Sequence, residues 1–504
     1  MRTPIQYLQE PYPLKSNVIF FHDGRYVWEG NPRWRNAAGE KLEFDYYGNA
    51  PDPDDVWWAS DSSPAGVRLR ALPGKKSEPF LHVDKPWEDM LRHVSVLRDG
   101  GKYRMWYGTR EHGCYAESDD ALTWRKPRLG LCDADGNRDN NILFDKNMPS
   151  TKGAQSSGDV FIDPSAPPGE RYKAFLRARY SMDAFAEFKA KHPGSIEPGF
   201  KPKAGSPDVL GETGAVSPDG IHWTIYPLPQ VIHKSDTQNI AYYDTELKKY
   251  VGYFRTHVFG KRSIGRAETD DFRGFPLPET IVWPDASQAL YDVWYGNGRA
   301  SYPGAPDYHL MFCRRWRVAE DAWSVHLATS PDGIMWGFPP ENKVLSPTPG
   351  RQWDSGAVTV GSGMVALPDG RVGAPILGYQ VPHKYPRFNG LGKVAWATWE
   401  KDRLVALEAE EYGRFETNLV SFQGDTLHLN VRTKHVGFVQ VEVLDSKGDQ
   451  IEGRTFADCD FINGDYLDKV VTWRGESNLG RGMDEPVSFR VKLAYGQLFS
   501  MRFK

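Results

Sequence analysis

VSPDGIHW at residues 216–223 is one copy of a stretch that recurs along the chain and decides how the remainder is interpreted. ESDDALTW at 117–124 and TSPDGIMW at 329–336 are close copies, and ETDDFRGF at 268–275 is a weaker one. Asp accepts hydrogen bonds within a turn, Gly supplies an unusual φ, and Trp offers a large apolar surface between neighbouring elements. We therefore predict that the repeated stretch is a structural turn and does not hold the chemistry.

Between these turns the sequence follows a pattern of paired strands. HVSVLRDGGKYRMWYG at 93–108 and IAYYDTELKKYVGYFR at 240–255 alternate apolar and polar residues around an Asp/Gly turn or a polar turn. Such alternation predicts β-hairpins. Each hairpin is followed by a further apolar strand and the turn, and the Ser or Thr positions of the turns are 99, 52 and 61 residues apart. Recurring units of four strands are typical of a β-propeller.

Five units can be counted, and the fifth lacks the turn. Their first hairpins begin near residues 92, 159, 238, 291 and 355. We expect N-terminal strands, either SNVIFFHDG at 16–24 or VWWASD at 56–61, to complete the ring.

From about Trp399 the pattern changes to clean antiparallel strands that predict a separate β-sandwich. The predicted fold is therefore all-β: a five-bladed β-propeller over 1–398, with an insertion at 180–207, followed by a β-sandwich over 399–504. An exposed edge of the sandwich is compatible with a homo-oligomer.

The insertion contains the one clear helix. In SMDAFAEFKAKH at 181–192, Ser181 is placed to cap the helix, and Phe185 and Phe188 lie on one face. The insertion leaves the end of a second strand, so it is either a lid or wall beside the pocket or a packing spacer.

Composition excludes several classes of partner. Lys and Arg number 62 against 66 Asp and Glu, which gives no reason to expect nucleic acid or an anionic membrane. No apolar run approaches the roughly 20 residues that cross a bilayer. The four scattered cysteines are expected to be reduced and buried. The first residues do not resemble a signal peptide, so we expect a cytoplasmic location or, after removal of a signal peptide, a periplasmic one.

An acidic residue precedes the first strand of every unit. These acids are Glu88 with its neighbour Asp89, Asp159, Asp236, Asp292 and Asp354. In a four-stranded blade the start of the first strand and the end of the second share one face, so we expect the acids to ring a central channel there. Crowded carboxylates raise one another's pKa, which would supply the acid and the base of glycoside cleavage. The alternative is that each acid only forms a turn.

Cationic residues end the second strands and are expected on the same face. They are Arg110, Arg177, Arg179, Arg255, Arg314 and Arg315, with His383 and Lys384 in the fifth unit and His93 nearby. Some must pair with the acids, because a buried unpaired charge is costly. A surplus could bind a carboxylate, sulfate or phosphate. No histidines have metal-ligand spacing, so neither a metal nor a cofactor is expected.

The chain resembles the five-bladed propeller glycosidases, which include invertases, levansucrases, arabinanases and neoagarooligosaccharide hydrolases. The resemblance rests on residues 101–131, on SGDVFIDP at 157–164, on SPDGIHW and on the trailing strands. It implies that Glu88 is the base or nucleophile, Asp159 the transition-state carboxylate and Asp236 the general acid. The superfamily usually has Asp first and Glu third, and its NDPNG and ECP motifs are absent here, so fructan chemistry is not implied.

The expected activity is exo-acting hydrolysis of an oligosaccharide, with an anionic or anhydro sugar favoured by the arginines. The residues expected to bind substrate are Asp89, His93, Arg110, Arg177, Arg179, Arg255, Asp292, Arg315, Asp354 and His383. Two alternatives remain open: a glycoside phosphorylase with an arginine-rich phosphate site, and a carbohydrate-binding propeller without catalysis.

Overall fold

The computed structural model describes residues 10–29, 64–147, 152–154, 158–284, 288–384, 392–482 and 484–504. Over these residues the chain is almost entirely β and has one α-helix. All four cysteines are buried and unpaired, as predicted. No helix of the described part is long and apolar enough to cross a membrane.

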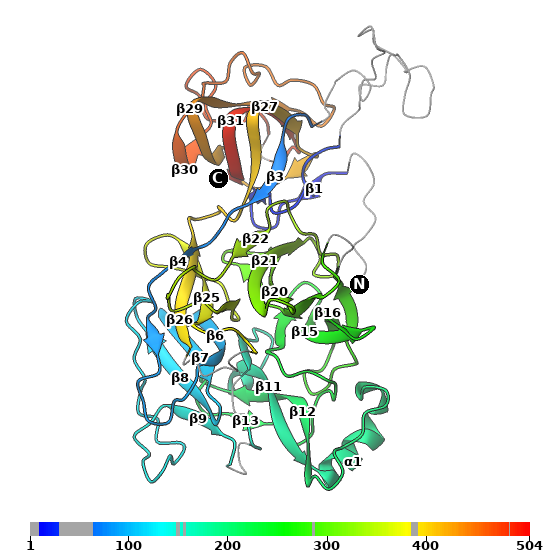
Figure 1. Cartoon of the computed structure of the whole chain (residues 1–504). Coiled ribbons are helices and arrows are strands. Elements are labelled where there is room, and N and C mark those ends of the chain that lie inside the picture. Colours follow the sequence, from blue (N-terminus) through cyan, green and yellow to red (C-terminus); the bar gives the residue numbers. More distant parts are fainter. Residues whose placement is uncertain are drawn as a thin grey trace.

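Five antiparallel sheets follow one another along the chain (Figure 1). Sheet one comprises β6 (Arg92–Asp99), β7 (Lys102–Gly108), β8 (His112–Ser118) and β9 (Ile142–Asp145). Sheet two comprises β10 (Asp159–Ile162), β11 (Tyr172–Ser181), β12 (Asp208–Ser217) and β13 (Thr224–Ile225). Sheet three comprises β14 (Ile240–Asp244), β15 (Lys249–Val258), β16 (Lys261–Thr269) and β17 (Glu279–Val282).

The last two sheets carry extra short strands. Sheet four comprises β18 (Asp292–Gly296), β19 (Arg299–Tyr302), β20 (Ala305–Arg317), β21 (Ala322–Ser330) and β22 (Lys343–Leu345). Sheet five comprises β23 (Ala357–Val360), β24 (Val365–Ala366), β25 (Val372–Tyr379), β26 (Lys393–Trp399), β4 (Lys75–Lys76) and β5 (Leu81–His82). The five first strands begin within two residues of the predicted positions, which confirms the unit count.

The five sheets contact one another in a closed order. Contacts join β6 to β10, β10 to β14, β16 to β18, β21 to β23 and β25 back to β6. Figure 1 shows the sheets arranged around a common centre.

The ring is closed by an N-terminal segment, although not by the residues expected. β4 and β5 pair with β26, so residues that precede sheet one complete sheet five. The expected segment 16–24 is elsewhere, because β2 (Val18–Phe20) pairs with β31 (Ser488–Phe503) near the end of the chain. The other expected segment, 56–61, lies outside the described residues.

The repeated stretch is a turn, as predicted. In the copy at 216–223, the Asp219 carboxylate accepts hydrogen bonds from the backbone N–H groups of Ile221 and His222, each at 2.9 Å. The Ser217 hydroxyl oxygen accepts from the N–H of Gly220, whose φ is +80°. These local bonds satisfy the backbone of the turn.

Each of the three close copies of the turn also accepts a hydrogen bond from a neighbouring sheet. The buried side chains of Trp106, Tyr253 and Trp396 donate to the backbone carbonyls of Gly220, Gly333 and Ala121, at 2.8, 2.7 and 2.8 Å. In every case the donor lies on a sheet next to the one that carries the turn. The repeat therefore joins adjacent sheets.

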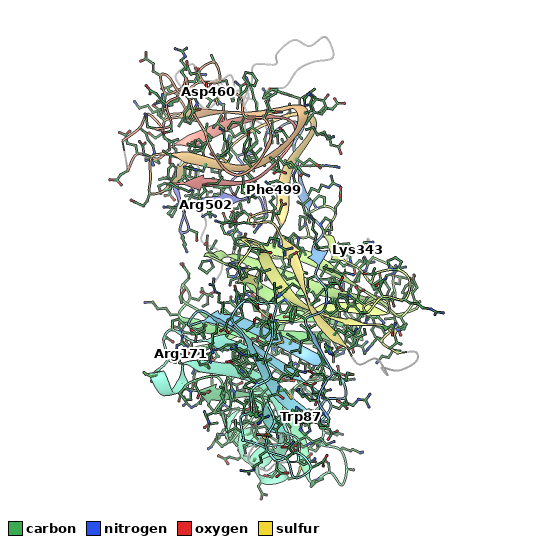
Figure 2. The ribbon with its side chains drawn as sticks, turned by 90° about the vertical axis from the view of Figure 1, so that its left-hand side faces the viewer. Trp87, Arg171, Lys343, Asp460, Phe499 and Arg502 are labelled. Carbon is green, nitrogen blue, oxygen red and sulfur yellow. The ribbon has the colours of Figure 1, made fainter. Side chains whose placement is uncertain are left out.

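The C-terminal strands form a separate six-stranded sheet in the order β3-β27-β31-β29-β30, with β2 paired to β31. Its members are β2, β3 (Arg68–Ala71), β27 (Val405–Glu416), β29 (Leu427–Leu444), β30 (Asp465–Val470) and β31. A short parallel pair, β1 (Tyr12–Pro13) and β28 (Val420–Ser421), lies beside it. Figure 2 shows Asp460, Phe499 and Arg502 in this part of the molecule, away from Arg171 and Trp87 at the other end.

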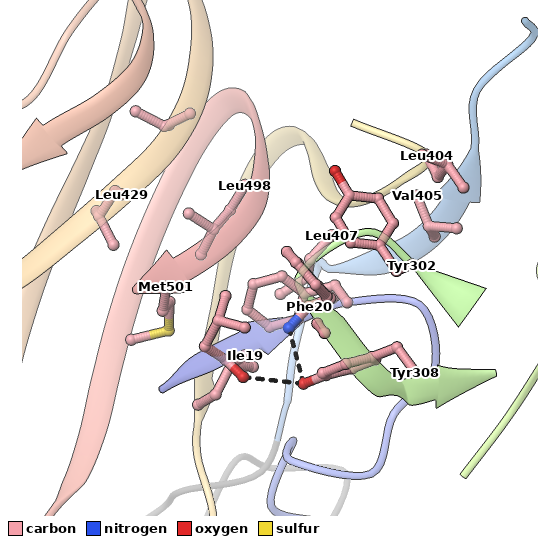
Figure 3. Packing of buried hydrophobic residues seen from close by; sticks show 14 of the residues in the cluster. Ile19, Phe20, Tyr302, Tyr308, Leu404, Val405, Leu407, Leu429, Leu498 and Met501 are labelled. Atoms are coloured by element: carbon pink, nitrogen blue, oxygen red, sulfur yellow. Dashed lines mark hydrogen bonds between the residues drawn. The ribbon is translucent and has the colours of Figure 1, made fainter. Parts of the chain in front are cut away.

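A continuous hydrophobic core joins this sheet to sheet four. The Tyr308 hydroxyl donates to the carbonyl of Val18 at 3.0 Å and accepts from the N–H of Phe20 at 3.1 Å. Figure 3 shows Phe20, Tyr302 and Tyr308 packed next to Leu498 and Met501. The N-terminal strand β2 therefore lies between sheet four and the C-terminal sheet and contacts both.

The predicted helix is α1 (Met182–Lys191). The Ser181 hydroxyl accepts from the N–H of Ala184, and Phe185 and Phe188 are buried, as predicted. The helix packs against β11 and β12.

Lys76 gives a test of the ring closure. Its ammonium contacts the carboxylate of Asp354, which is fully buried, and donates to the Thr348 hydroxyl at 2.9 Å. Lys76→Met leaves that carboxylate buried without its cation, so we expect the free energy of unfolding in urea to fall by about 3–5 kcal/mol. Lys75→Met, at the exposed neighbour on the same strand, is the matched control and should change it little. Equal effects of the two substitutions would contradict this account.

Candidate functional site

A cavity of about 180 Å³ lies where sheets one, two and three meet. Its walls come from the start of β6, the end of β11, the start of β12 and the segment before β14. The lining residues are Arg92, His93, Gly153, Gly158, Phe175, Leu176, Arg177, Arg179, Leu210, Glu212, Asp236, Thr237, Gln238 and Asn239. This is the face at which first strands begin and second strands end, as the sequence predicts for the chemistry.

Glu212 is the more buried of the two carboxylic acids in the cavity. It lies on β12 directly opposite Arg177 of β11, and the Arg177 Nε is 3.1 Å from its Oε1. Only 3% of the Glu212 side chain is exposed. Burial raises the pKa of Glu212 to about 7, although the charge of Arg177 opposes this rise. A large fraction of Glu212 is therefore protonated at neutral pH.

Asp236 is the second carboxylic acid and has the opposite character. Its side chain is largely exposed and forms an ion pair with Arg255, of which only 4% is exposed. Partial burial opposes ionisation of Asp236, but the charge and hydrogen bond of Arg255 outweigh it and lower the pKa of Asp236. Asp236 is therefore ionised at neutral pH.

The ion pairs Arg177–Glu212 and Arg255–Asp236 are close enough to shift each other's pKa values. The negative charge of Asp236 raises the pKa of Glu212, and the positive charge of Arg177 helps to lower that of Asp236. Two carboxyl groups whose pKa values are displaced in opposite directions can divide the roles of acid and base.

His93 lines the cavity in an unusual backbone conformation. Its φ is +51°, and the register of β6 against β7 shifts between Arg92 and Ser95. Bulges next to a site re-aim a side chain, and positive φ at a non-glycine residue is costly, so this geometry is held in place by its surroundings. Burial, reinforced by the charge of Arg92, lowers the pKa of His93 to about 3, so the imidazole is neutral.

Gln238 ties three sheets together at the cavity wall. Its side-chain amide donates to the carbonyls of Val94 in sheet one, at 3.2 Å, and of Gly158 before sheet two, at 3.0 Å. Asp236 is two residues away, so these bonds fix the segment that carries it.

Of the predicted acids only Asp236 lines the cavity, and three of the others pair with cations elsewhere in the fold. Glu88 accepts from Lys126 at 2.7 Å and from the Tyr107 hydroxyl at 2.6 Å. Asp292 accepts from Arg315 at 2.8 Å, and Asp354 pairs with Lys76. The expected ring of acids around one channel therefore does not form at these three positions. Their buried carboxylates are neutralised by cations within the fold.

Asp159 is buried where three sheets meet. Its carboxylate accepts from the N–H of Ala241 in sheet three, at 2.8 Å, and from the hydroxyl of Ser362, which follows β23 of sheet five. Burial raises the pKa of Asp159 to about 6. Its neighbour Gly158 lines the cavity, but the Asp159 side chain does not.

The remaining predicted residues divide between the cavity and its surroundings. Arg179 lines the cavity and pairs with Asp208 at 3.0 Å. Asp89 and Arg110 pair with each other at an exposed site outside the lining, with Nε 3.4 Å from Oδ2. His383 is buried 3.0 Å from the Tyr295 hydroxyl. None of residues 180–207 lines the cavity, so the insertion packs beside sheet two without covering the site.

Sequence reasoning missed Glu212, Arg92 and the run Thr237–Asn239. Glu212 lies on a third strand, where no acid was sought. In the part of the chain that the structure describes, no cluster of three or more His, Cys, Asp or Glu residues could hold a metal ion.

No family model and no curated protein matches the chain. Among solved structures, it is similar to a thermostable family-43 glycoside hydrolase at 12% identity and a TM-score of 0.42, covering 64% of this chain and 95% of that one. A Bombyx mori β-fructofuranosidase is 8% identical with a TM-score of 0.38, covering 85% and 93%. An N-acetylgalactosamine deacetylase from F. plautii is 14% identical with a TM-score of 0.44, covering 68% and 97%. Likenesses this distant do not decide function, which has to be inferred from the residues of the chain itself.

Substitution of Asp159 distinguishes a structural from a catalytic role. Asp159→Asn keeps an acceptor for the Ala241 N–H and a partner for Ser362, so we expect turnover to stay within a few-fold of wild type. Asp159→Ala leaves the Ala241 N–H buried without an acceptor and should lower the free energy of unfolding by about 1–3 kcal/mol. A loss of activity of about a hundredfold or more in a stably folded Asp159→Asn would instead assign the carboxylate to the reaction.

Proposed function

We propose that the protein is a glycoside hydrolase whose five sheets are the blades of a five-bladed propeller with the active site at its centre. The observation that carries the proposal is the pair Glu212 and Asp236, which share one cavity and have pKa values displaced in opposite directions. Cleavage of a glycosidic bond requires one carboxylic acid and one carboxylate flanking that bond.

In this mechanism Glu212 is the general acid. Its proton passes to the leaving glycosidic oxygen, and the carboxylate that forms is stabilised by the charge of Arg177. Asp236 acts on the other side of the sugar as base toward water or as nucleophile. Arg255 keeps it ionised. The lowered pKa of Asp236 therefore reverses the role of general acid that the resemblance implied for it.

The dimensions and rim of the site support action at the end of an oligosaccharide. The cavity is small, at about 180 Å³, and its walls come from three sheets. At the same end of sheet three, Phe259 is almost fully exposed and forms an edge-to-face pair with Trp283, with ring centroids 6.3 Å apart. Exposed aromatic rings offer an apolar surface on which further sugar units could stack.

A second candidate is glycoside phosphorolysis, and it is favoured by the cations that line the cavity. Arg92, Arg177 and Arg179 all reach the lining, where they could hold inorganic phosphate. Cleavage that requires added phosphate and releases a sugar phosphate would assign this function in place of hydrolysis.

Removal of either carboxyl group should strongly reduce turnover and leave the fold intact. We expect Glu212→Gln and Asp236→Asn each to lower kcat/KM by about 10²–10⁴-fold, the usual contribution of acid–base catalysis. Glu279→Gln, an exposed carboxylate on β17, is the control and should be unaffected. The measurement is sugar release from a screened oligosaccharide, with far-ultraviolet circular dichroism to verify folding. Full activity in either variant would exclude that residue from the reaction.

The pH dependence follows from the same two groups. The rate should fall on the alkaline side as Glu212 loses its proton near pH 7, and on the acid side only below the ordinary range of an aspartic acid. The native state binds more protons than the unfolded state between the ordinary pKa of Glu and about 7, so stability should also decline as pH rises through this window. The alkaline limb of kcat/KM should be lost in Glu212→Gln, and the decline in stability should become smaller, leaving the part at lower pH that Asp159 contributes. A limb that persists in the variant would assign it to another group.

A further inference from the structure

Three guanidinium groups surround the ring of one buried tyrosine beside the cavity. The Cζ atoms of Arg314, Arg255 and Arg262 lie 4.7, 5.2 and 5.4 Å from the ring centre of Tyr295, on β18. Arg262 also contacts Trp316, at 5.2 Å. Cation–π contact holds the three groups close together despite their mutual repulsion.

Among the residues that the structure describes, carboxylates do not balance this positive charge. Within the described residues, Asp236 is the only acid whose ion pair with any of the three is resolved, and it pairs with Arg255. Arg314 donates to the hydroxyls of Thr237, at 3.0 Å, and Thr359, at 3.2 Å. Burial lowers the pKa of Arg314 to about 10. A buried guanidinium without a counter-ion is costly and is retained where something else supplies the charge.

Several donor atoms of the cluster have no partner. The Nε atoms of Arg255, Arg262 and Arg314, and one terminal nitrogen of Arg255, are buried without a hydrogen-bond acceptor in the part of the chain that the structure describes. These are the donors with which a guanidinium grips a planar or tetrahedral oxyanion.

The histidines around the cluster do not change its charge. Burial lowers the pKa of His383 and His233 to about 3 and of His257 to about 4, helped by the neighbouring arginines. All three imidazoles are neutral at physiological pH. The positive charge of the cluster therefore comes from the guanidinium groups, with the ammonium of Lys384 5.6 Å from the ring centre of Trp316, and not from these imidazoles.

We propose that this cluster binds an oxyanion carried by the substrate, a carboxylate or a sulfate on a sugar ring, so that the protein acts on acidic saccharides. The inference rests on the proposed glycosidase function and specifies its substrate class. Because Arg255 contacts both Asp236 and Tyr295, the anionic group belongs to the sugar unit at the bond to be cleaved.

The experiment compares substrates that differ only in this charge. Uronic-acid oligosaccharides are assayed against the same oligosaccharides with each carboxylate reduced to a hydroxymethyl group, and sulfated oligosaccharides form a second arm. Calorimetric titrations with glucuronate, glucose and inorganic phosphate measure binding independently of turnover. The variant is Arg262→Gln, because Arg262 is half-buried and, unlike Arg255, does not pair with Asp236. The control is Arg273→Gln, which removes a positive charge from the opposite end of the same sheet, where Arg273 pairs with Glu170.

We expect wild-type protein to prefer an acidic saccharide, and Arg262→Gln to lower kcat/KM or affinity for it by about 10- to 100-fold, as for a lost hydrogen bond to a charged group. Neutral saccharides should be affected little, and Arg273→Gln should behave as wild type.

Equal use of carboxylated and reduced substrates overturns the acidic-substrate inference and leaves the hydrolase proposal standing. Tight binding of acidic saccharides without turnover supports the anion site and contradicts the hydrolase. Cleavage of neutral saccharides only with phosphate, weakened in Arg262→Gln, overturns the inference in favour of phosphate as the anion.

Discussion

Closure of the ring is the constraint on which the site depends. Sheet five takes its outer strands from residues that precede sheet one, so the two ends of the ring are held by the same segment, and Lys76 pins that segment to the buried Asp354. Once the ring is closed, the start of β6, the end of β11 and the segment before β14 have to meet, although they are far apart in sequence. The repeated turns join adjacent sheets at the opposite face, so the face with Asp236 does not carry this structural role.

The difference between Glu212 and Asp236 follows from their places in a blade. Glu212 lies within a strand, between neighbours on both sides, so burial dominates and favours its neutral form. Asp236 lies in the segment that leads into β14, where solvent and Arg255 favour the charged form. Each carboxyl has an arginine beside it, yet only the exposed one is held ionised. Desolvation and not the count of partners decides which group keeps its proton.

The local sequence pattern predicted much of the fold. The contacts that depend on how strands pair in the folded chain could not be predicted from it. Strand starts, the turn at 216–223 and the cap at Ser181 depend on nearby residues and were predictable. Asp236, His93, Arg177 and Arg179 were found from their positions at strand ends and do line the cavity. Glu88, Asp292 and Asp354 have the same local pattern, but their cations are Lys126, Arg315 and Lys76, whose proximity only the folded chain establishes. Glu212 was missed because it is identified by its position opposite Arg177 on the neighbouring strand. That position could be found by counting back along the third strand from Ser217.

Arg255 connects the two proposals, because it contacts both Asp236 and the arginine cluster around Tyr295. In the free protein its charge, with that of Arg262, holds the pKa of Asp236 low, which also makes Asp236 a weak base. An oxyanion bound to the cluster would offset part of that positive charge and raise the pKa of Asp236, bringing its basicity closer to what proton abstraction at neutral pH requires. The same anion would oppose ionisation of Glu212 and so keep the acid protonated. A charged substrate would in this way improve both partners at once, and a neutral sugar of the same shape would leave Asp236 under the full field of the arginines.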